Sequence, residues 1–447
     1  MKKIIRNIDK VRKNVSWIFV DKIFRLFFSF YITTLIVKYL GPEEFGLISY
    51  SIAFTSLIGI LASLGLQQVI IQKLVKNPKD SNQIITNSIV LIFILGVITY
   101  LLIFLIAEFF LSVNVEKQNM VLILGFVYVF HFFTVATYWF ESEVLSKYSL
   151  LLQSLVIFFT AFIKIYLIDS QSETQSFLMV IAFEIIFSKI LIFLFFLKKS
   201  NIKIAVNLID FRKVKSLFKA GMPLFLANIA VVAYMKIDQI MLAEISSLGE
   251  LGIYAASLRV IETFYFIPIA VSLSLFPSII SNQSLSQEVK DRKQQDGYSF
   301  IIIISILIIL PIVTFSEEII LLLFGSSFID SAKVLSVLMW SLIFISIGTL
   351  SQKWLVAENL KTHILKRAIY GLIINVLLNF ILIPYYGAYG ASLATVAANF
   401  FSSFLIDFYQ ERTRKMFFMK LKSLNFLYST KRFYLILTSL YGKSNKV

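Results

Sequence analysis

Long apolar stretches recur along the chain and are separated by short polar connections. A helix needs about 20 mainly apolar residues to cross the hydrocarbon core of a bilayer. This rule predicts twelve spans, at residues 15–37, 45–71, 84–108, 120–140, 149–168, 177–197, 217–240, 252–280, 298–321, 333–355, 364–384 and 388–409. The first span is not a cleavable signal peptide, because Asp21, Lys22 and Arg25 interrupt its apolar run. The pattern therefore predicts an all-α integral membrane protein.

Composition supports this class and narrows the chemistry. Of the 447 residues, 58% are hydrophobic and 15% are charged, against about 25% charged in soluble domains. The absence of cysteine excludes disulfide frameworks and thiolate metal sites. The two histidines, His131 and His363, are too few for an imidazole-rich metal site. We therefore expect no metal and no cofactor.

The distribution of basic residues predicts the orientation in the membrane, because positively charged loops stay in the cytoplasm. Alternate connections separate 32 Lys and Arg residues from three others, Lys38, Lys117 and Lys333. Such a division favours an even number of spans with both termini in the cytoplasm. The net charge of +16 is thus explained by topology, and no nucleic-acid partner is expected.

The connections also suggest how the chain is divided. The longest connection, 198–216, is interpreted as a cytoplasmic hinge after a cytoplasmic N-terminus (1–14) and a six-helix bundle (15–197). A second six-helix bundle (217–409) follows, and the segment 410–447 is a basic amphipathic cytoplasmic tail held to anionic lipid headgroups. The strings at 40–47 and 248–253 echo one another, so a pseudo-two-fold axis along the membrane normal is expected to relate the bundles.

Several charged and polar residues lie inside predicted spans, where a charge costs roughly 2.5–3.5 kcal/mol at the bilayer centre. Helical spacing places many of them on common faces, such as Asp21, Arg25 and Ser29 at i, i+4 and i+8. They therefore predict a water-filled, cationic lumen. The candidate substrate-binding cations are Lys22, Arg25, Lys164, Lys189, Lys236, Arg259 and Lys353. The candidate coupling carboxylates are Asp21, Glu184, Asp238 and Glu262, and the polar lumen candidates are His131, Tyr138, Gln153, Asn375, Asn379 and Asn399.

A second interpretation stays open for individual members of this set. Lys22, Lys189, Lys236 and Lys353 lie where their side chains can extend to the interface. Arg259 and Glu262 can also form a salt bridge with a purely structural role.

Motifs of common enzymes are missing from the sequence. In Gly442-Lys443-Ser444, which resembles the end of an ATP-binding loop, Leu437 occupies the place of the first glycine. ATP hydrolysis is therefore not expected, and neither H-E-x-x-H nor G-x-S-x-G occurs. The sequence predicts a transporter and not an enzyme.

The strings themselves resemble a known family. Leu40-Gly41-Pro42-Glu43-Glu44-Phe45-Gly46 is similar to the signature of bacterial polysaccharide exporters of the O-antigen flippase type. These exporters share a superfamily with multidrug-and-toxin-extrusion transporters and lipid II flippases. Ile237-Asp238-Gln239-Ile240-Met241-Leu242 and Tyr386-Gly387-Ala388-Tyr389-Gly390-Ala391 support the resemblance, which covers about residues 10–410.

The resemblance implies twelve helices in two bundles around a V-shaped cavity, as in the multidrug transporters. It implies transport of an undecaprenyl-pyrophosphate-linked oligosaccharide, of O-antigen (lipopolysaccharide) or capsule type, across the bacterial inner membrane, beside a polymerase and glycosyltransferases. Coupling to H⁺ or Na⁺ stays open, because Asn399 stands where many members carry a glutamate. The alternatives are a drug or cation antiporter on the same scaffold, a membrane glycosyltransferase or ligase, and a scaffold protein without transport.

Overall fold

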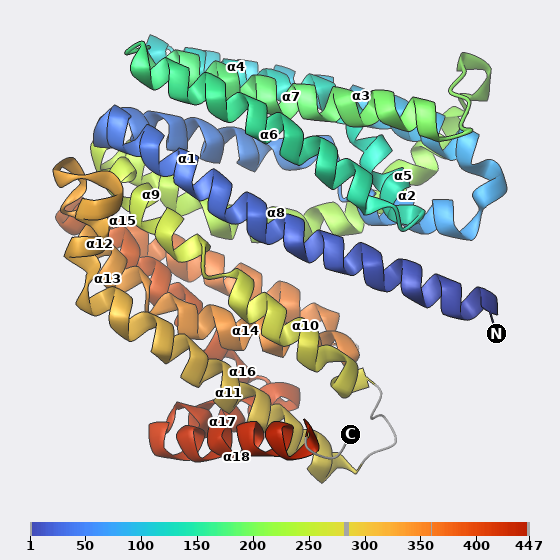
Figure 1. The fold of residues 1–447 in the computed structure, drawn as a ribbon. Coiled ribbons are helices and arrows are strands. Elements are labelled where there is room, and N and C mark those ends of the chain that lie inside the picture. Colours follow the sequence, from blue (N-terminus) through green and yellow to red (C-terminus); the bar gives the residue numbers. More distant parts are fainter. Residues whose placement is uncertain (1, 281–285, 359, 445–447) are drawn as a thin grey trace. The chain divides into compact units, whose positions relative to one another are not determined.

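The described residues, 2–280, 286–358 and 360–444 of a computed structural model, form an all-helical protein (Figure 1). The chain divides into two compact units, Met1–Lys236 and Ile237–Val447, here called the N-terminal and C-terminal units. The boundary between the two units falls within a helix, α8 (Phe211–Ile245). The cytoplasmic hinge expected at 198–216 stays a prediction.

The N-terminal unit is built around its first long helix. Helix α1 packs against α3 and α6, and α6 packs against α7. A cluster of buried side chains that includes Phe140 and Phe196 joins α2, α5 and α7. The helices of the unit before α8 are α1 (Lys2–Ser63), α2 (Leu66–Lys76), α3 (Ser81–Phe110), α4 (Val115–Gly125), α5 (Val135–Ser142), α6 (Ser146–Asp169) and α7 (Thr174–Lys199).

Helix α1 is broken at Gly41, inside the family-like string Leu40–Gly46. Gly41 has φ 74° and ψ 178°, a conformation that a residue without a side chain adopts without strain. Pro42 follows, at a first helical position where its missing N–H group is not needed. The predicted end of one span at 37 and start of the next at 45 enclose this break.

The predicted span at 120–140 is not a continuous α-helix. A 3₁₀ segment, Phe126–Thr134, separates α4 from α5. Uniformly apolar sequence does not reveal this change, because its hydrophobic pattern has no period that distinguishes three residues per turn from 3.6. Likewise, the predicted span at 252–280 is divided between α9 (Leu248–Glu262) and α10 (Phe266–Ile280).

The C-terminal unit is a second group of helices that pack against one another. Helix α14 packs against α10, α11 and α15, and α13 packs against α9 and α15. Its remaining elements are α11 (Gln287–Thr314), α12 (Ser316–Phe324), α13 (Ser331–Leu338), α14 (Ser341–Ala357), α15 (Lys361–Phe400), the π-helical turn Phe401–Leu405, α16 (Ile406–Tyr409), α17 (Glu411–Leu424) and α18 (Phe426–Ser444).

Helix α15 is also broken at a glycine. Gly387 has a positive φ of 51°, and the Glu250 carboxylate of α9 accepts a 2.6 Å hydrogen bond from the backbone N–H of Ala388. A Cβ added to Gly387 would lie 2.3 Å from the Glu250 Oε2 atom. The break therefore depends on the absence of a side chain at 387 and on the carboxylate beside it.

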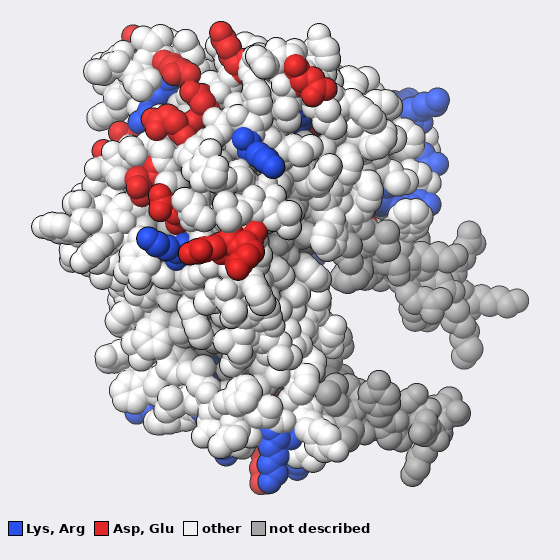
Figure 2. Space-filling model, turned by 60° about the vertical axis from the view of Figure 1, so that its left-hand side comes forward, with Lys and Arg blue, Asp and Glu red and all other residues white. Residues whose placement is uncertain are grey.

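Among the described residues, nine helical segments are long and apolar enough to cross a membrane, and ten if the bent pair Phe211–Leu226 and Asn228–Ile245 counts as one. Large apolar side chains are exposed on the helices, for example Phe109 (78%) and Leu322 (80%). Figure 2 shows that much of the drawn surface carries neither acidic nor basic groups. A chain with these properties is a multi-pass membrane protein.

Candidate functional site

A cavity of about 540 Å³ lies inside the N-terminal unit. It is called here the N-terminal cavity, and α2, α5, α6 and α7 supply most of its lining. Helical spacing brings the polar groups to one face: Ser146, Ser149 and Gln153 follow one another on α6 at three and four residues. The lining residues are Gln67, Thr134, Thr137, Tyr138, Glu141, Ser146, Ser149, Leu150, Gln153, Ile157, Glu184, Ile185, Ser188, Lys189 and Ile192.

Four of the predicted site residues line this cavity, namely Tyr138, Gln153, Glu184 and Lys189. Six further hydroxyl or amide side chains line it that the sequence analysis did not single out, among them Gln67, Ser146 and Ser149. For Ser146 and Ser149, the helical spacing to the predicted residue Gln153 was a signal that could have identified them.

Arg25 reaches the cavity lining through Gln153. Its guanidinium forms an ion pair with Asp21 one turn earlier on α1 and donates a hydrogen bond to the Gln153 side-chain oxygen. Ser154 donates a 2.6 Å hydrogen bond to the same Asp21 carboxylate. The predicted polar stripe of α1 is thus turned toward α6, and Asp21 neutralises its cation.

Lys164 is also neutralised by a carboxylate. Its Nζ atom lies 2.6 Å from the Glu184 Oε2 atom on α7, and Thr160 donates a hydrogen bond to the same oxygen. This pair joins α6 to α7. Because the negative charge of Glu184 compensates the ammonium group, Lys164 presents little net charge to the cavity.

Lys189 differs from both, since within the described part of the chain no carboxylate pairs with it. Its Nζ atom lies 3.3 Å from His131 Nδ1. An ammonium group can only donate, so Nδ1 accepts and the imidazole carries its proton on Nε2. That Nε2 atom is buried and has no hydrogen-bond partner among the described atoms. Lys189 is therefore the cation available to a ligand of the cavity.

The carboxylate of Glu141 lies on the same lining. It accepts a 3.0 Å hydrogen bond from the Gln67 amide, which links α5 to α2. The cavity thus combines one unpaired ammonium group, carboxylates already hydrogen-bonded, and many hydroxyls. Such a set can hydrogen-bond a polyhydroxyl ligand and neutralise an acidic group on it.

The other predicted residues lie outside this cavity. In the C-terminal unit, Tyr254 donates a hydrogen bond to the buried Asp238 carboxylate and lies 3.0 Å from the Thr395 hydroxyl. Asn375 and Asn379 are hydrogen-bonded to each other at 3.0 Å, and Asn399 donates to the Thr395 carbonyl. These groups bond mainly to one another, although the buried Asn379 Oδ1 atom has no hydrogen-bond partner among the described atoms.

The remaining cations are less enclosed. Arg259 and Glu262 form a 3.3 Å salt bridge with side chains 41% and 33% exposed, as the structural interpretation of the pair expected. Lys236 and Lys353 are half-buried. The side chain of Lys22 lies outside the described residues.

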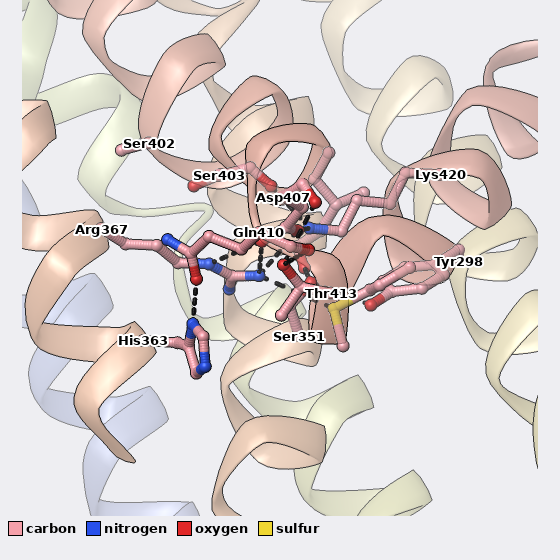
Figure 3. A network of polar contacts seen from close by, with 12 residues as sticks. Tyr298, Ser351, His363, Arg367, Ser402, Ser403, Asp407, Gln410, Thr413 and Lys420 are labelled. Carbon is pink, nitrogen blue, oxygen red and sulfur yellow. Dashed lines mark hydrogen bonds and ion pairs between the residues drawn. The ribbon is translucent and has the colours of Figure 1, made fainter. Parts of the chain in front are cut away.

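One charged cluster was missed by the sequence analysis. Arg367, Asp407 and Lys420, which belong to α15, α16 and α17, meet in the C-terminal unit (Figure 3). Arg367 lies at the beginning of the predicted span 364–384 and Lys420 in the predicted tail, and their separation along the chain hides the contact between their helices. An unpaired carboxylate at Asp407, near the end of a predicted span, was the available signal.

Comparison with known proteins identifies the family. Residues 11–283 match the family described as "Polysaccharide biosynthesis protein". The chain belongs to this family. Its resemblance to polysaccharide exporters is thereby confirmed, and residues 223–381 also match the MatE family.

Relatives of this polysaccharide biosynthesis protein agree with the assignment. It is 27% identical over 203 residues to the "Probable low-salt glycan biosynthesis flippase Agl15" of Haloferax volcanii, covering 44% of this chain and 42% of Agl15. The match thus spans less than half of that relative. It is 24% identical to the "Capsular polysaccharide biosynthesis protein CapF" of Staphylococcus aureus, covering 89% of this chain and 98% of CapF.

The fold is that of a solved transporter. "Lipid II flippase MurJ, inward closed conformation" aligns over 96% of this chain and 99% of that chain, with a TM-score of 0.71 and 15% identity. At this identity the likeness concerns the fold alone. The names of these proteins include flippases, in agreement with the expectation that the family member is not an enzyme.

Proposed function

We propose that this protein is a flippase that carries lipid-linked polysaccharide precursors across a membrane. Membership of the polysaccharide biosynthesis family supports the proposal, as do the names of Agl15 and MurJ. A glycan attached to a phosphate-bearing lipid is too polar to cross hydrocarbon unaided.

The observation that carries the proposal is the N-terminal cavity. Its volume of about 540 Å³ lies within the roughly 300–1,000 Å³ of small-molecule sites. Its hydroxyl, amide and carboxylate groups suit the hydroxyls of sugars, and Tyr138 offers an aromatic surface. Lys189, with its uncompensated charge, suits a phosphate or an acidic sugar.

The finer assignment follows the sequence. The substrate is an undecaprenyl-pyrophosphate-linked oligosaccharide of O-antigen or capsule type, moved outward across a bacterial inner membrane. A potential that is negative inside favours outward movement of an anion by roughly 2.3 kcal/mol per charge per 100 mV. H⁺ or Na⁺ coupling through Asp21, Glu184, Asp238 or Glu262 would add to this force, without ATP. A polymerase and glycosyltransferases would act beside the flippase.

The topology belongs to the same proposal. Two of the apolar segments, Phe24–Lys76 and Thr362–Tyr409, are 53 and 48 residues long and contain the breaks at Gly41 and Gly387. A span needs about 20 residues, so each segment can cross twice. We therefore retain twelve crossings in two groups of six, with both termini in the cytoplasm.

Reconstitution tests the function directly. The purified full chain is placed in liposomes with a fluorescent lipid-linked oligosaccharide, and a membrane-impermeant quencher reports which leaflet holds the label. We expect the protein to expose labelled lipid from both leaflets, whereas protein-free liposomes protect about half of it. Protection that is equal with and without the protein contradicts the proposal.

The match to the MatE family favours one alternative, a drug or cation antiporter. That function predicts accumulation of an organic cation dye such as ethidium in the same liposomes under an ion gradient. Dye transport without movement of the glycolipid would replace the flippase assignment.

A further inference from the structure

The segment after Asp407 is bound into the C-terminal unit. Lys420 of α17 is fully buried and donates 2.6 Å hydrogen bonds to the Asp407 carboxylate and to the Ser403 carbonyl. The side chain of Gln295 on α11 donates to the Met419 carbonyl of α17. Helix α18 is held to α11 by the 2.8 Å ion pair of Arg432 with Asp296. Both helices lie along α11 (Figure 1), so α17 and α18 have fixed inner and outer faces.

The outer face of these helices is both basic and apolar. Phe418 is 53% exposed and Leu427 81%, and they lie near the exposed side chains of Arg412, Lys422 and Lys431 in the sequence. We call these five residues the tail face. From Arg412 to Val447 the sequence contains no Asp or Glu. Within the described part of the chain, no carboxylate pairs with the three cations of the tail face, in contrast to Lys420 and Arg432.

A second helix adds positive charge beside the tail face. Lys366 of α15 and Arg412 of α17 both lie close enough to His363 to act on it electrostatically. The exposed Lys366 thus extends the positive region toward the beginning of α15. Basic side chains mixed with exposed aromatic and aliphatic groups are typical of a surface that lies in the headgroup region of a bilayer.

We propose that the tail face is a binding surface for anionic phospholipid headgroups, separate from the cavity of the N-terminal unit. The cations attract the phosphate groups, while Phe418 and Leu427 enter the acyl boundary. The orientation predicted from the loop charges places this surface at the cytoplasmic leaflet, where anionic lipids gather. The inference goes beyond the proposed flippase activity and does not depend on it.

Native mass spectrometry of the full chain in detergent tests the inference, with phosphatidylglycerol and phosphatidylcholine as probes. The variant R412Q/K422Q/K431Q is compared with R212Q/K215Q/K219Q, which removes the same charge from exposed positions of α8. Each basic residue near a charged surface contributes about fivefold. We therefore expect wild type to bind phosphatidylglycerol at least tenfold more tightly than phosphatidylcholine, the tail-face variant to lose this preference, and the α8 variant to keep it.

Three outcomes would overturn the proposal. Wild type with equal affinity for the two lipids would show that no anionic surface exists. A tail-face variant that retains the preference would place the site elsewhere. Equal losses in both variants would reveal only general attraction to basic residues. Both variants should unfold at the wild-type temperature, because the replaced side chains are exposed. This control shows that the comparison concerns folded protein.

Discussion

Lys189 and Arg25 are both cations of apolar helices, yet their surroundings give them different roles. Arg25 shares its charge with Asp21, whereas Lys189 lines the N-terminal cavity and contacts the His131 imidazole. A charge without a carboxylate partner is the one that gains most from an anionic ligand. At the scale of single residues, local pairing therefore distinguishes Lys189, the proposed substrate-binding cation, from Arg25.

Replacing Lys189 by Gln should slow transport of a lipid-linked oligosaccharide by roughly 10- to 100-fold. This range corresponds to the loss of a hydrogen bond between charged groups, worth about 1.5–3 kcal/mol. Lys189→Arg should restore much of the rate, since it retains the charge. The initial rate of label exposure in proteoliposomes measures both variants.

Lys198→Gln is the matched control for Lys189→Gln. It removes one cation from an exposed position of the same helix, α7, outside the cavity lining, so the transport rate should change less than about twofold. A Lys189→Gln protein that folds and transports at the wild-type rate would remove Lys189 from the substrate site.

At the scale of helices, Lys420 joins α17 to the rest of the C-terminal unit. Lys420→Met should lower the free energy of unfolding by about 1–3 kcal/mol, because the buried Asp407 carboxylate and the Ser403 carbonyl both lose a hydrogen-bond donor. Lys422→Met, on the exposed side of the same helix, should change it by less than about 0.5 kcal/mol. Thermal unfolding of the detergent-solubilised variants makes the comparison. Equal effects of the two substitutions would contradict the role of Lys420.

The free energy of unfolding should depend on pH through the protonation of Lys420. Burial lowers the pKa of Lys420 to about 7, an effect opposed by Asp407 and increased by Arg367. Between about pH 7 and the ordinary pKa of lysine, the unfolded chain binds more protons than the folded one. The free energy of unfolding should therefore rise as the pH increases from 7 to 10. Lys420→Met should flatten this rise, as measured by urea unfolding across the range.

The break in α15 should tolerate no side chain at position 387. Gly387→Ala combines a positive φ with a Cβ that would lie 2.3 Å from Glu250 Oε2, so we expect a loss of roughly 1–3 kcal/mol in unfolding free energy. Gly390→Ala is an unsuitable control because backbone atoms crowd it, whereas Gly41→Ala isolates the backbone strain, since nothing lies within 4 Å of an added Cβ. A loss at 387 no larger than the loss at 41 would show that Glu250 moves aside easily.

At the scale of the whole molecule, the predicted topology can be tested with single cysteines, because the natural chain has none. Lys203→Cys and Glu173→Cys alter exposed side chains in successive connections of the N-terminal unit. A membrane-impermeant maleimide should label Glu173→Cys in intact cells. It should label Lys203→Cys only after the cells are lysed. The reverse labelling would invert the orientation, and labelling of both would refute the separation of these connections by α7.

The sequence predicted what depends on local composition. Apolar runs located the membrane helices, and the gap between the predicted spans 15–37 and 45–71 encloses the break in α1. The 3₁₀ segment Phe126–Thr134 was not predictable, since its residues are as apolar as those of an α-helix. Of the candidate site, Gln153 and Lys189 were identified by their polarity inside spans.

Pairing between distant helices was beyond the sequence. Nothing in the order of residues shows that Glu184 neutralises Lys164, or that Arg367 and Lys420 share Asp407. A count of buried cations therefore overstated the charge available to a ligand.

The contact of Glu250 with the turn at Gly387 has an evolutionary consequence. The carboxylate fills the space that a side chain at 387 would need and also caps the Ala388 N–H group. Homologous sequences should therefore vary at these two positions together: glycine at 387 with an acidic or amide residue at 250, and a larger residue at 387 with a small one at 250. An alignment of the family in which the two positions vary independently would show that other members build this turn in a different way.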